Sequence, residues 1–359
     1  MSGSLPTGDS GSDFPVPHPL VLALDAMGGD GGPSVVVDAA LAELADEPNL
    51  ELILVGAEDL LRQLVNERTG GRSPTRLRFQ PAPEVIAMDD NPITALRNKK
   101  HSSMRVAINL VHTGIAQACV SSGNTGALMV AAKTVLKMLP AMDRPAICAP
   151  IPTRIGHTLM LDLGANAICT PNQLLEFAVM GSAMAQAVYG VTQPTVGLLN
   201  IGTEEIKGHG AIKQAHELLN QSGLNYRGYL EGTDINQGRV DVIVSDGFAG
   251  NVALKTMEGT ASLINDFIRE EFSRTVVSRI VGLGALPIIR SLRKRLDPRL
   301  YNGASFLGVN GIVVKSHGNA DAVAFRHAIC RAVSEIRNEL LAKILRLQQT
   351  VLPSQTPAD

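Results

Sequence analysis

The sequence LVLAL at residues 20–24, followed by DAMGGD at residues 25–30, decides the fold class of this chain. A short, bounded apolar run is typical of a buried strand in a parallel sheet. Residues 33–46 predict a helix, and Pro33 stands where a proline of the first helical turn belongs. Glycines let the backbone turn sharply, and a helix amino terminus offers free N–H groups to an anion. The stretch therefore predicts a strand–turn–helix unit of an α/β fold, with a ligand site at the turn.

Three further segments combine glycine with polar residues in the same way. They are SSGNTG at 121–126, DLGAN at 162–166 and SDGFAGN at 245–251. Each ends an apolar run, at 116–120, 158–161 and 240–244, the first being the weakest. Because ligands of open α/β sheets bind outside the carboxyl ends of the strands, we expect the four segments to line one crevice at that edge.

The rest of the chain alternates predicted strands with predicted helices. Further strands are expected at 50–55, 146–150, 195–199 and 311–315. Helices are expected at 33–46, 92–112, 125–139, 172–189, 210–220, 251–272 and 320–349. This alternation predicts a three-layer α/β/α architecture, with a mostly parallel sheet covered on both faces.

The length of 359 residues allows one elaborate domain or two interleaved lobes. We expect residues 1–18 to be a disordered tail, residues 19–345 to be a single catalytic domain, and residues 346–359 to be a carboxyl-terminal tail. The first 18 residues lack the basic start and apolar core of a signal peptide. No apolar run reaches the roughly 18 to 20 residues that span a bilayer, so we expect a cytoplasmic protein.

Composition narrows the function classes. The net charge is −2, aromatic residues make up 3% and there is no Trp, which argues against a nucleic-acid partner. The eight histidines show no short paired spacing, so no metal site is expected. The cysteines are far apart in apolar surroundings and predict buried thiols of a reducing compartment: Cys119, Cys148, Cys169 and Cys330.

Two more segments complete the set of motifs, NIGTEEIKG at 200–208 and KSHG at 315–318. In this order, from about residue 20 to residue 345, the motifs resemble those of the bacterial phosphate acyltransferases of phospholipid synthesis. That family shares its fold in outline with the isocitrate and isopropylmalate dehydrogenases and with phosphate acetyltransferase. The chain departs from the family pattern in its amino-terminal tail and after about Leu345, and neither departure touches a motif.

The resemblance implies that inorganic phosphate attacks the thioester of a fatty acyl group on acyl carrier protein, which gives acyl phosphate and the free carrier thiol. It implies no metal and no organic cofactor. It also implies a homodimer, and delivery of the product to a membrane-embedded acyl-phosphate:glycerol-3-phosphate acyltransferase. Phosphate is already a nucleophile, so the enzyme need only desolvate it, hold it in line and stabilise a developing oxyanion.

Lys207 is the first candidate for a catalytic residue, because its ammonium follows a glycine turn and can pair with phosphate. The alternative is an exposed loop lysine in an ion pair with Glu204 or Glu205. A nucleotide-binding P-loop does not fit, because no glycine precedes the lysine and no Ser or Thr follows it.

Asn251 and His317 are proposed donors to the thioester oxygen or to phosphate. The alternatives are a helix cap for Asn251 and for Asn124, and a turn residue for His317. Most of the acids are expected to serve in turns or caps, since four carboxylates would repel one phosphate. The residues expected to form the substrate site are Asp25, Gly28, Gly29, Asp30, Ser122, Gly123, Asn124, Thr125, Gly126, Asp162, Gly164, Asn166, Asp246, Gly247, Lys315 and Gly318.

The segment 276–300 is a basic amphipathic insertion. From Arg274 to Leu300 seven residues are basic and one is acidic. Such a segment fits a membrane interface, with its apolar side chains at the acyl boundary and its cations on anionic headgroups. A dimer contact and a site for an acidic carrier protein are the alternatives. The expected membrane contacts are Leu283, Leu286, Ile288, Ile289, Arg290 and Arg293.

Three rival functions stay open. A dehydrogenase of the isocitrate type would bind a nicotinamide cofactor, but no G-x-G-x-x-G follows the first strand. A short-chain phosphate acetyltransferase acting on acyl-CoA differs in pocket size, which sequence does not give. A non-catalytic membrane scaffold would have no reason to bind phosphate.

Overall fold

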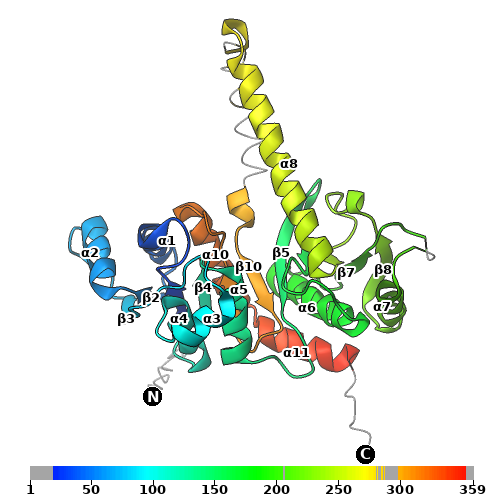
Figure 1. The fold of residues 1–359 in the computed structure, drawn as a ribbon, viewed down its shortest axis with the longest axis horizontal. Helices are drawn as coiled ribbons and strands as arrows, with labels where there is room; N and C mark the ends of the chain where they lie inside the picture. The colour runs from blue at the N-terminus through cyan, green and yellow to red at the C-terminus, as the bar shows by residue number, and fades with distance from the viewer. Residues whose placement is uncertain are drawn as a thin grey trace, which may run out of the picture.

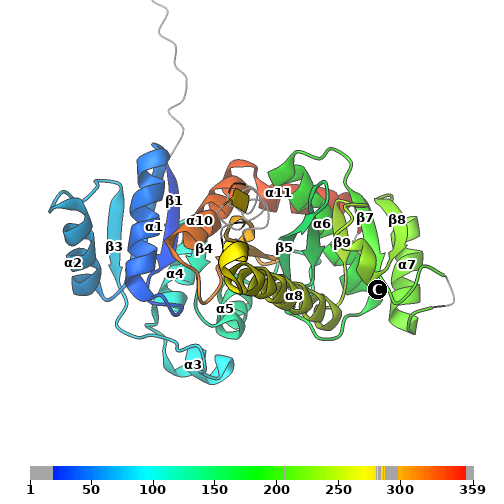
Figure 2. The same cartoon turned by 90° about the horizontal axis from the view of Figure 1, so that it is seen from above.

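In the computed structural model, the described residues are 19–204, 207–279, 281, 284, 285, 287 and 298–352. They form one eleven-stranded sheet in the order β3-β2-β1-β4-β11-β10-β5-β6-β9-β7-β8 (Figures 1 and 2). The strands are β1 (Leu20–Asp25), β2 (Leu50–Gly56), β3 (Leu77–Pro81), β4 (Ala118–Ser121), β5 (Ala146–Thr153), β6 (Gly156–Leu161), β7 (Thr195–Leu199), β8 (Asn225–Leu230), β9 (Val242–Val244), β10 (Ala304–Leu307) and β11 (Ile312–Lys315).

Helices cover both faces of the sheet, as expected. They are α1 (Gly32–Asp46), α2 (Glu58–Thr69), α3 (Pro92–Asn98), α4 (Ser103–His112), α5 (Thr125–Ala131), α6 (Pro171–Tyr189), α7 (Gly210–Gln221), α8 (Gly247–Ser273), α10 (Ala322–Arg337) and α11 (Leu340–Val351). A π-helical turn (Ala132–Leu136) extends α5, and short 3₁₀ turns lie at Gly232–Asp234 and Pro298–Tyr301.

The buried side chains divide into three clusters that follow these layers. One cluster joins α1 and α10 to the strands around β1, and a second joins α6, α7 and α11 to the strands around β9. The third lies on the opposite face and holds residues of α4, α5 and the base of α8. The three-layer α/β/α prediction is therefore confirmed, with parallel pairing in most of the sheet.

Strand direction changes in the middle of the sheet. β1, β4 and β11 are mutually parallel, and β6, β9 and β7 form a second parallel set. Between them, β10 is antiparallel to both β11 and β5, and β5 is antiparallel to β6. Three successive antiparallel pairings make the second set run opposite to the first across the sheet.

Several expected elements differ from those observed. The helix expected at 92–112 is split into α3 and α4, and the helix expected at 320–349 breaks at Glu339, which has a φ of 52°. α11 continues through the expected boundary at residue 345 to Val351, and Leu347 and Val351 pack against the α6 cluster. The sequence did not indicate α2, β3, β8 or β10. Two of these strands, β3 and β8, form the edges of the sheet, where the apolar pattern is weakest.

α8 is the element that departs most from the compact body. It begins at the end of β9, and its outer part extends well away from the sheet (Figure 1). Its exposed side chains include Leu263, Ile264 and Phe267. This long helix carries the candidate residue Asn251 in its first turns, so its base belongs to the site and its outer part does not.

Candidate functional site

The carboxyl ends of β1, β4 and β11 bring three of the motifs together in what we call the first cluster. Asp25 and Lys315 are both in register with Ser121, so the three residues end adjacent strands at the same level. The Ser121 hydroxyl donates a hydrogen bond to Asp25 Oδ2 over 2.6 Å. The motif that decides the fold class thus shares one site with segments about 100 and 290 residues further along the chain.

The glycines of the first cluster allow a close approach of backbone to backbone. A Cβ on Gly28 would lie 2.7 Å from the amide nitrogen of Gly123, and Gly29 has a φ of 82°. Ser122 Oγ donates to the Gly28 carbonyl over 2.8 Å. The amide of Asp30 donates to the carbonyl of Gly318 over 2.7 Å. The turns after β1, β4 and β11 are therefore bonded directly to one another.

Lys315 supplies a buried positive charge at this point. The residue is 8% exposed, and its Nζ donates to the carbonyl of Ser122 over 3.3 Å and to the carbonyl of Ser316. Burial lowers the pKa of Lys315 to about 8, while Asp25 and Asp30 act in the opposite direction. A cation beside glycine turns and the amino terminus of α5 suits a small anion.

The carboxylate of Asp25 lies near the Lys315 ammonium and opposes its positive charge. It is 1% exposed, and burial raises its pKa, opposed by the hydroxyls of Ser103 and Ser121. Its Oδ1 accepts a hydrogen bond from the Met27 amide over 3.4 Å. Its carboxylate therefore holds the turn, which agrees with the expected turn role of the acids.

His317 follows Lys315 in the first cluster and is close enough to α8 for charges on that helix to act on it. The His317 amide donates to Asn302 Oδ1 over 3.0 Å, which fixes the turn after Lys315. Desolvation lowers the pKa of His317; Glu258 raises it, and Lys315 and Lys255 lower it. Lys255 and Glu258 follow Asn251 at i+4 and i+7, so the three share one face of α8. Sequence reasoning missed Lys255 and Glu258, although this spacing was a usable signal.

The second cluster lies at the carboxyl ends of β6 and β9, and Asp162 is its centre. Asp162 is fully buried. Its Oδ1 accepts from the amides of Ile147, Gly164 and Ala165, and its Oδ2 accepts from the amide and the side chain of Asn166. Burial raises the pKa of Asp162, and these hydrogen bonds oppose that shift. Its carboxylate is thus used to shape the loop.

Asn166, Asp246 and the glycines complete this loop. The Asn166 side-chain amide also donates to the Pro145 carbonyl over 2.7 Å. The backbone carbonyl of Asn166 accepts a hydrogen bond from the Gly247 amide. Asp246 caps α8 through the Ala249 amide over 2.7 Å. A Cβ on Gly250 would overlap the Asp162 carbonyl oxygen, so α8 leaves the sheet in close contact with the loop.

Asn251 is placed differently from the other polar residues of the second cluster. Its side chain is exposed and lies beside Gly164, where a Cβ would be 3.4 Å from Asn251 Cβ. It sits inside the first turns of α8, and the cap of that helix is Asp246. Asn251 is therefore not the cap that we considered as its alternative role, and its amide faces solvent on the side of α8 that leads to His317.

Lys207 lies in the loop after β7. Its Nζ is 3.1 Å from Glu204 Oε1, and the side chains are 45% and 57% exposed. The Asn200 side chain donates to the carbonyls of Gly202 and Lys207, which closes the loop on itself. The ion pair that we considered as the alternative role is present. Glu205, the other possible partner, lies outside the described residues.

Asn124 joins the first cluster to the loop before α3. Its Oδ1 caps α5 through the Ala127 amide, and its Nδ2 donates to the carbonyls of Ala87, Met88 and Asp90. The cap considered as its alternative role is thus present. Thr125 and Gly126 form the exposed first turn of α5, with a Cβ on Gly126 lying 2.7 Å from Pro92.

The expectation of one crevice along a single sheet edge is wrong. Because β6 and β9 run opposite to β1, β4 and β11, the motifs form two clusters at opposite strand edges, with Lys207 in a separate loop. The base of α8 links the two clusters, since Asn251 lies beside Gly164 while Lys255 and Glu258 act on His317. The candidate site is the first cluster together with this face of α8.

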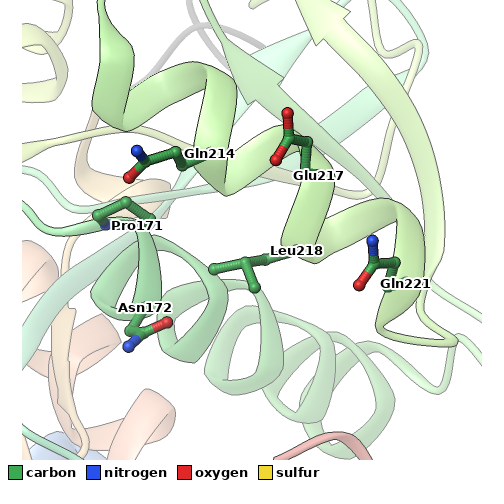
Figure 3. A pocket seen from close by; sticks show the side chains of 6 residues that line it. All are labelled: Pro171, Asn172, Gln214, Glu217, Leu218 and Gln221. Carbon is green, nitrogen blue, oxygen red and sulfur yellow. The ribbon is translucent and has the colours of Figure 1, made fainter.

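One hollow of the described surface lies away from the motifs. A depression of about 370 Å³ separates the amino terminus of α6 from α7 and is lined by Pro171, Asn172, Gln214, Glu217, Leu218 and Gln221 (Figure 3). None of these residues belongs to the motifs, and the lining offers no cation to a phosphate. We therefore do not assign substrate binding to it.

The remaining expectations concern metals, thiols and membranes. Within the described ranges, no three His, Cys, Asp or Glu side chains gather as a metal site, and no helix there is long and apolar enough to cross a bilayer. All four cysteines are free, and three of them are buried. The expected membrane contacts Leu283, Leu286, Ile288, Ile289, Arg290 and Arg293 all lie outside the described residues.

Sequence comparison decides the family. Residues 20–343 match the model of a family described as fatty acid synthesis protein. The phosphate acyltransferase of Alkalilimnicola ehrlichii is 56% identical over 94% of this chain and 99% of its own length. The chain belongs to the phosphate acyltransferase family. The phosphate acyltransferase of Methylococcus capsulatus is 55% identical over 90% of this chain and 95% of its own length. The chain is therefore an acyltransferase.

Solved structures support the fold. A phosphotransacetylase from Streptococcus pyogenes matches with a TM-score of 0.60 and 18% identity, over 89% of this chain and 94% of that one. A candidate 4-hydroxythreonine-4-phosphate dehydrogenase from Salmonella typhimurium matches with a TM-score of 0.51 and 12% identity, over 88% and 99%. At these identities the likeness concerns the fold alone, and it confirms the expected relation to the acetyltransferase and dehydrogenase architectures.

Proposed function

We propose that the protein transfers a fatty acyl group from the thioester of acyl carrier protein to inorganic phosphate, for phospholipid synthesis. A phosphate oxygen attacks the carbonyl carbon, the C–S bond breaks, and the carrier leaves as a thiolate that takes up a proton. The products are acyl phosphate and the free carrier thiol. The observation that carries this proposal is the buried ammonium of Lys315, set between glycine turns at the amino terminus of α5.

The residues of the first cluster have separate roles in this reaction. Lys315 and the amides of the Gly28–Gly29 turn bind the phosphate and offset its charge. His317, and Asn251 on the face of α8 that carries Lys255, donate to the thioester oxygen as it becomes negative. Lys207 remains a proposed phosphate ligand from the loop after β7, which is separate from the first cluster, so it would leave Glu204 and move to the phosphate.

Hydroxylamine trapping tests the reaction. Purified protein is incubated with phosphate and a long-chain acyl carrier thioester, and the acyl phosphate is captured as a hydroxamate. Hydroxylamine also reacts directly with the thioester, so a reaction without enzyme gives the background. We expect hydroxamate above this background only when phosphate is present, and we expect Lys315→Met to abolish that excess. Enzyme-dependent hydroxamate formation that does not require phosphate would contradict the proposal, because the enzyme would then transfer the acyl group directly to the amine.

The rival functions give different results. Acetyl-CoA consumed faster than long-chain donors would indicate a short-chain phosphate acetyltransferase. Saturable binding of NAD or NADP would favour a dehydrogenase. A calorimetric titration with inorganic phosphate that gives no heat would favour a scaffold, since only an enzyme of this class needs a phosphate site.

We further propose that the protein is a homodimer that associates with the inner face of the cell membrane. Exposed apolar side chains on the outer part of α8, Leu263 and Phe267, support a contact between copies. Val276 and Val277, each 71% exposed, begin the basic amphipathic segment and support attachment to anionic lipid. This position would pass the labile acyl phosphate to a membrane-embedded acyltransferase.

Two measurements separate these contacts. Leu263→Glu with Phe267→Glu is expected to give monomers in sedimentation velocity.

Leu286→Glu with Ile289→Glu is expected to abolish co-flotation with anionic vesicles while activity in lipid-free assay is retained. Flotation that is unchanged in the second variant would exclude this segment as the anchor. If this variant loses activity in the lipid-free assay, the segment is instead a contact with the second subunit or with the carrier protein.

A further inference from the structure

A surface beside the first cluster combines exposed apolar side chains with cations. We define the α3 surface as Val85, Met88, Ile93, Arg97, Lys100 and His101. Val85, Met88 and Ile93 are 39%, 44% and 70% exposed, and the three basic residues are exposed as well. The surface lies on α3 and its flanking loops, and α3 stands out from the body of the molecule beside α5 (Figure 2). No role in the reaction described above uses these side chains.

The charge of this region differs from that of the whole chain. The net charge is −2, yet no acidic residue occurs from Asn91 to Met142. Of the acids that precede α3, Asp90 lies 2.5 Å from Lys99 Nζ, which lowers the pKa of Asp90. Glu84 accepts a hydrogen bond from the His101 amide over 2.7 Å. These two carboxylates hold the loop. A third acid, Asp89, is exposed beside Met88, and the exposed basic residues Arg97, Lys100 and His101 outnumber it.

The α3 surface begins at the rim of the first cluster. Met88 lies against the last turn of the site, because a Cβ on Gly318 would be 3.0 Å from Met88 Cε. The Asn124 side chain holds this loop through the carbonyls of Met88 and Asp90, over 2.9 and 3.1 Å. Whatever binds to the surface is therefore adjacent to Lys315 and the glycine turns.

Apolar side chains ringed by cations suit an acidic protein. Apolar anchors supply the buried area of a protein interface, and complementary charge steers the encounter and sets its orientation. A nucleic acid would instead need aromatic stacking residues, and the segment 85–105 contains none apart from the ring of His101. The acyl donor of the proposed function is held on a small acidic carrier protein that must bring its thioester to the first cluster.

We propose that the α3 surface is the docking site of this carrier protein. This inference rests on the proposed function, since it assigns the place where the protein part of the acyl donor binds. The carrier contacts Val85, Met88 and Ile93 with its apolar residues and Arg97 and Lys100 with its acids, and its thioester arm passes Met88 into the first cluster.

Charge reversal tests the docking site. In Arg97→Glu with Lys100→Glu we expect the KM for the acyl carrier thioester to rise about tenfold or more, with kcat unchanged at saturation. The salt dependence of kcat/KM should weaken in the same variant. The matched control is Arg72→Glu with Arg227→Glu, two exposed arginines near the outer edge strands β3 and β8, which should leave the KM unchanged.

The controls separate the possible failures. Phosphate titration and the melting temperature should match wild type, which shows that the first cluster and the fold are intact. Wild-type protein that makes no acyl phosphate from the carrier thioester contradicts the proposed function. A wild type that is active beside an Arg97→Glu, Lys100→Glu variant with the same KM contradicts the docking site alone. Loss of vesicle flotation in that variant would also overturn the inference, because the surface would then bind lipid.

Discussion

At the scale of single residues, the structure separates side chains that hold the site from side chains that face it. Asp25, Asp162 and Asp246 use their carboxylates on amides and hydroxyls of their own turns. Lys315 is enclosed but directed at carbonyl groups, which a phosphate oxygen can replace. The acids therefore shape the glycine turns, and Lys315 is the group that we propose binds phosphate.

The pH dependence of catalysis tests Lys315. Its pKa of about 8 means that the ammonium dominates below pH 8 and the neutral amine above it. We expect kcat/KM for phosphate to fall as the pH rises through about 8, because the charge that offsets phosphate is then lost. Lys315→Arg, which stays charged, should remove this alkaline limb from the pH profile. If the arginine variant keeps an alkaline limb at the same pH, a group other than Lys315 causes that limb.

Lys207 needs a test that separates catalysis from its ion pair. If the ammonium binds phosphate in the transition state, Lys207→Ala should lower kcat/KM by about 10², or roughly 2.7 kcal/mol, with the fold intact. Glu204→Gln removes the same exposed ion pair but keeps the ammonium, so it should leave the rate within a few-fold of wild type. Two variants with near wild-type rates would assign Lys207 to the ion pair alone.

At the scale of elements, α8 ties the second cluster to the first. Its amino terminus is capped by Asp246 and packed on the Asp162 loop, so the helix leaves the sheet in a fixed direction. The next two turns carry Asn251, Lys255 and Glu258 past the turn of His317. The helix thereby assembles side chains that the strand directions alone would keep apart.

Two glycine substitutions in α8 test this packing. A Cβ on Gly250 would overlap the Asp162 carbonyl, so Gly250→Ala should lower the free energy of unfolding by about 1–3 kcal/mol and reduce activity. A Cβ on Gly259 meets nothing within 4 Å, so Gly259→Ala should raise the free energy of unfolding by about 0.5–1 kcal/mol. Chemical denaturation measures both values. Equal stability of the two variants would mean that α8 does not depend on close contact with the loop.

At the scale of the whole molecule, two parallel half-sheets of opposite direction meet through β10 and β5. Each half carries its own glycine turns at its own carboxyl edge. The positive charge of the site is Lys315, at the end of β11 in the first half-sheet. α8 begins after β9 in the second half-sheet and extends toward the first. The proposed site therefore depends on how the two halves are joined.

Chelation is the test at this scale. In the proposed function, Lys315 and backbone amides supply the positive charge that phosphate requires, and attack of phosphate on a thioester needs no Lewis acid. We therefore expect full activity in excess EDTA. Activity that disappears on chelation and returns with a divalent cation would show that a metal takes part.

The sequence alone determined the fold class and indicated which polar segments end strands, because both are local properties. An apolar run that ends in a glycine turn and a helix specifies its own strand, turn and helix start, as at Leu20–Asp46. The same local pattern identified the polar residues of both clusters. It failed for the edge strands β3 and β8, whose partly exposed positions leave a weak apolar pattern.

Only the tertiary structure decided which of these residues meet. Strand direction within the sheet depends on contacts between distant segments, and the three antiparallel pairings around β10 and β5 divided the expected single crevice into two. For the same reason the sequence did not reveal that Lys255 and Glu258 act on the charge of His317, or that Asn124 holds a loop beside the cluster. A local pattern fixes the conformation of a segment, but packing over the whole chain fixes its neighbours.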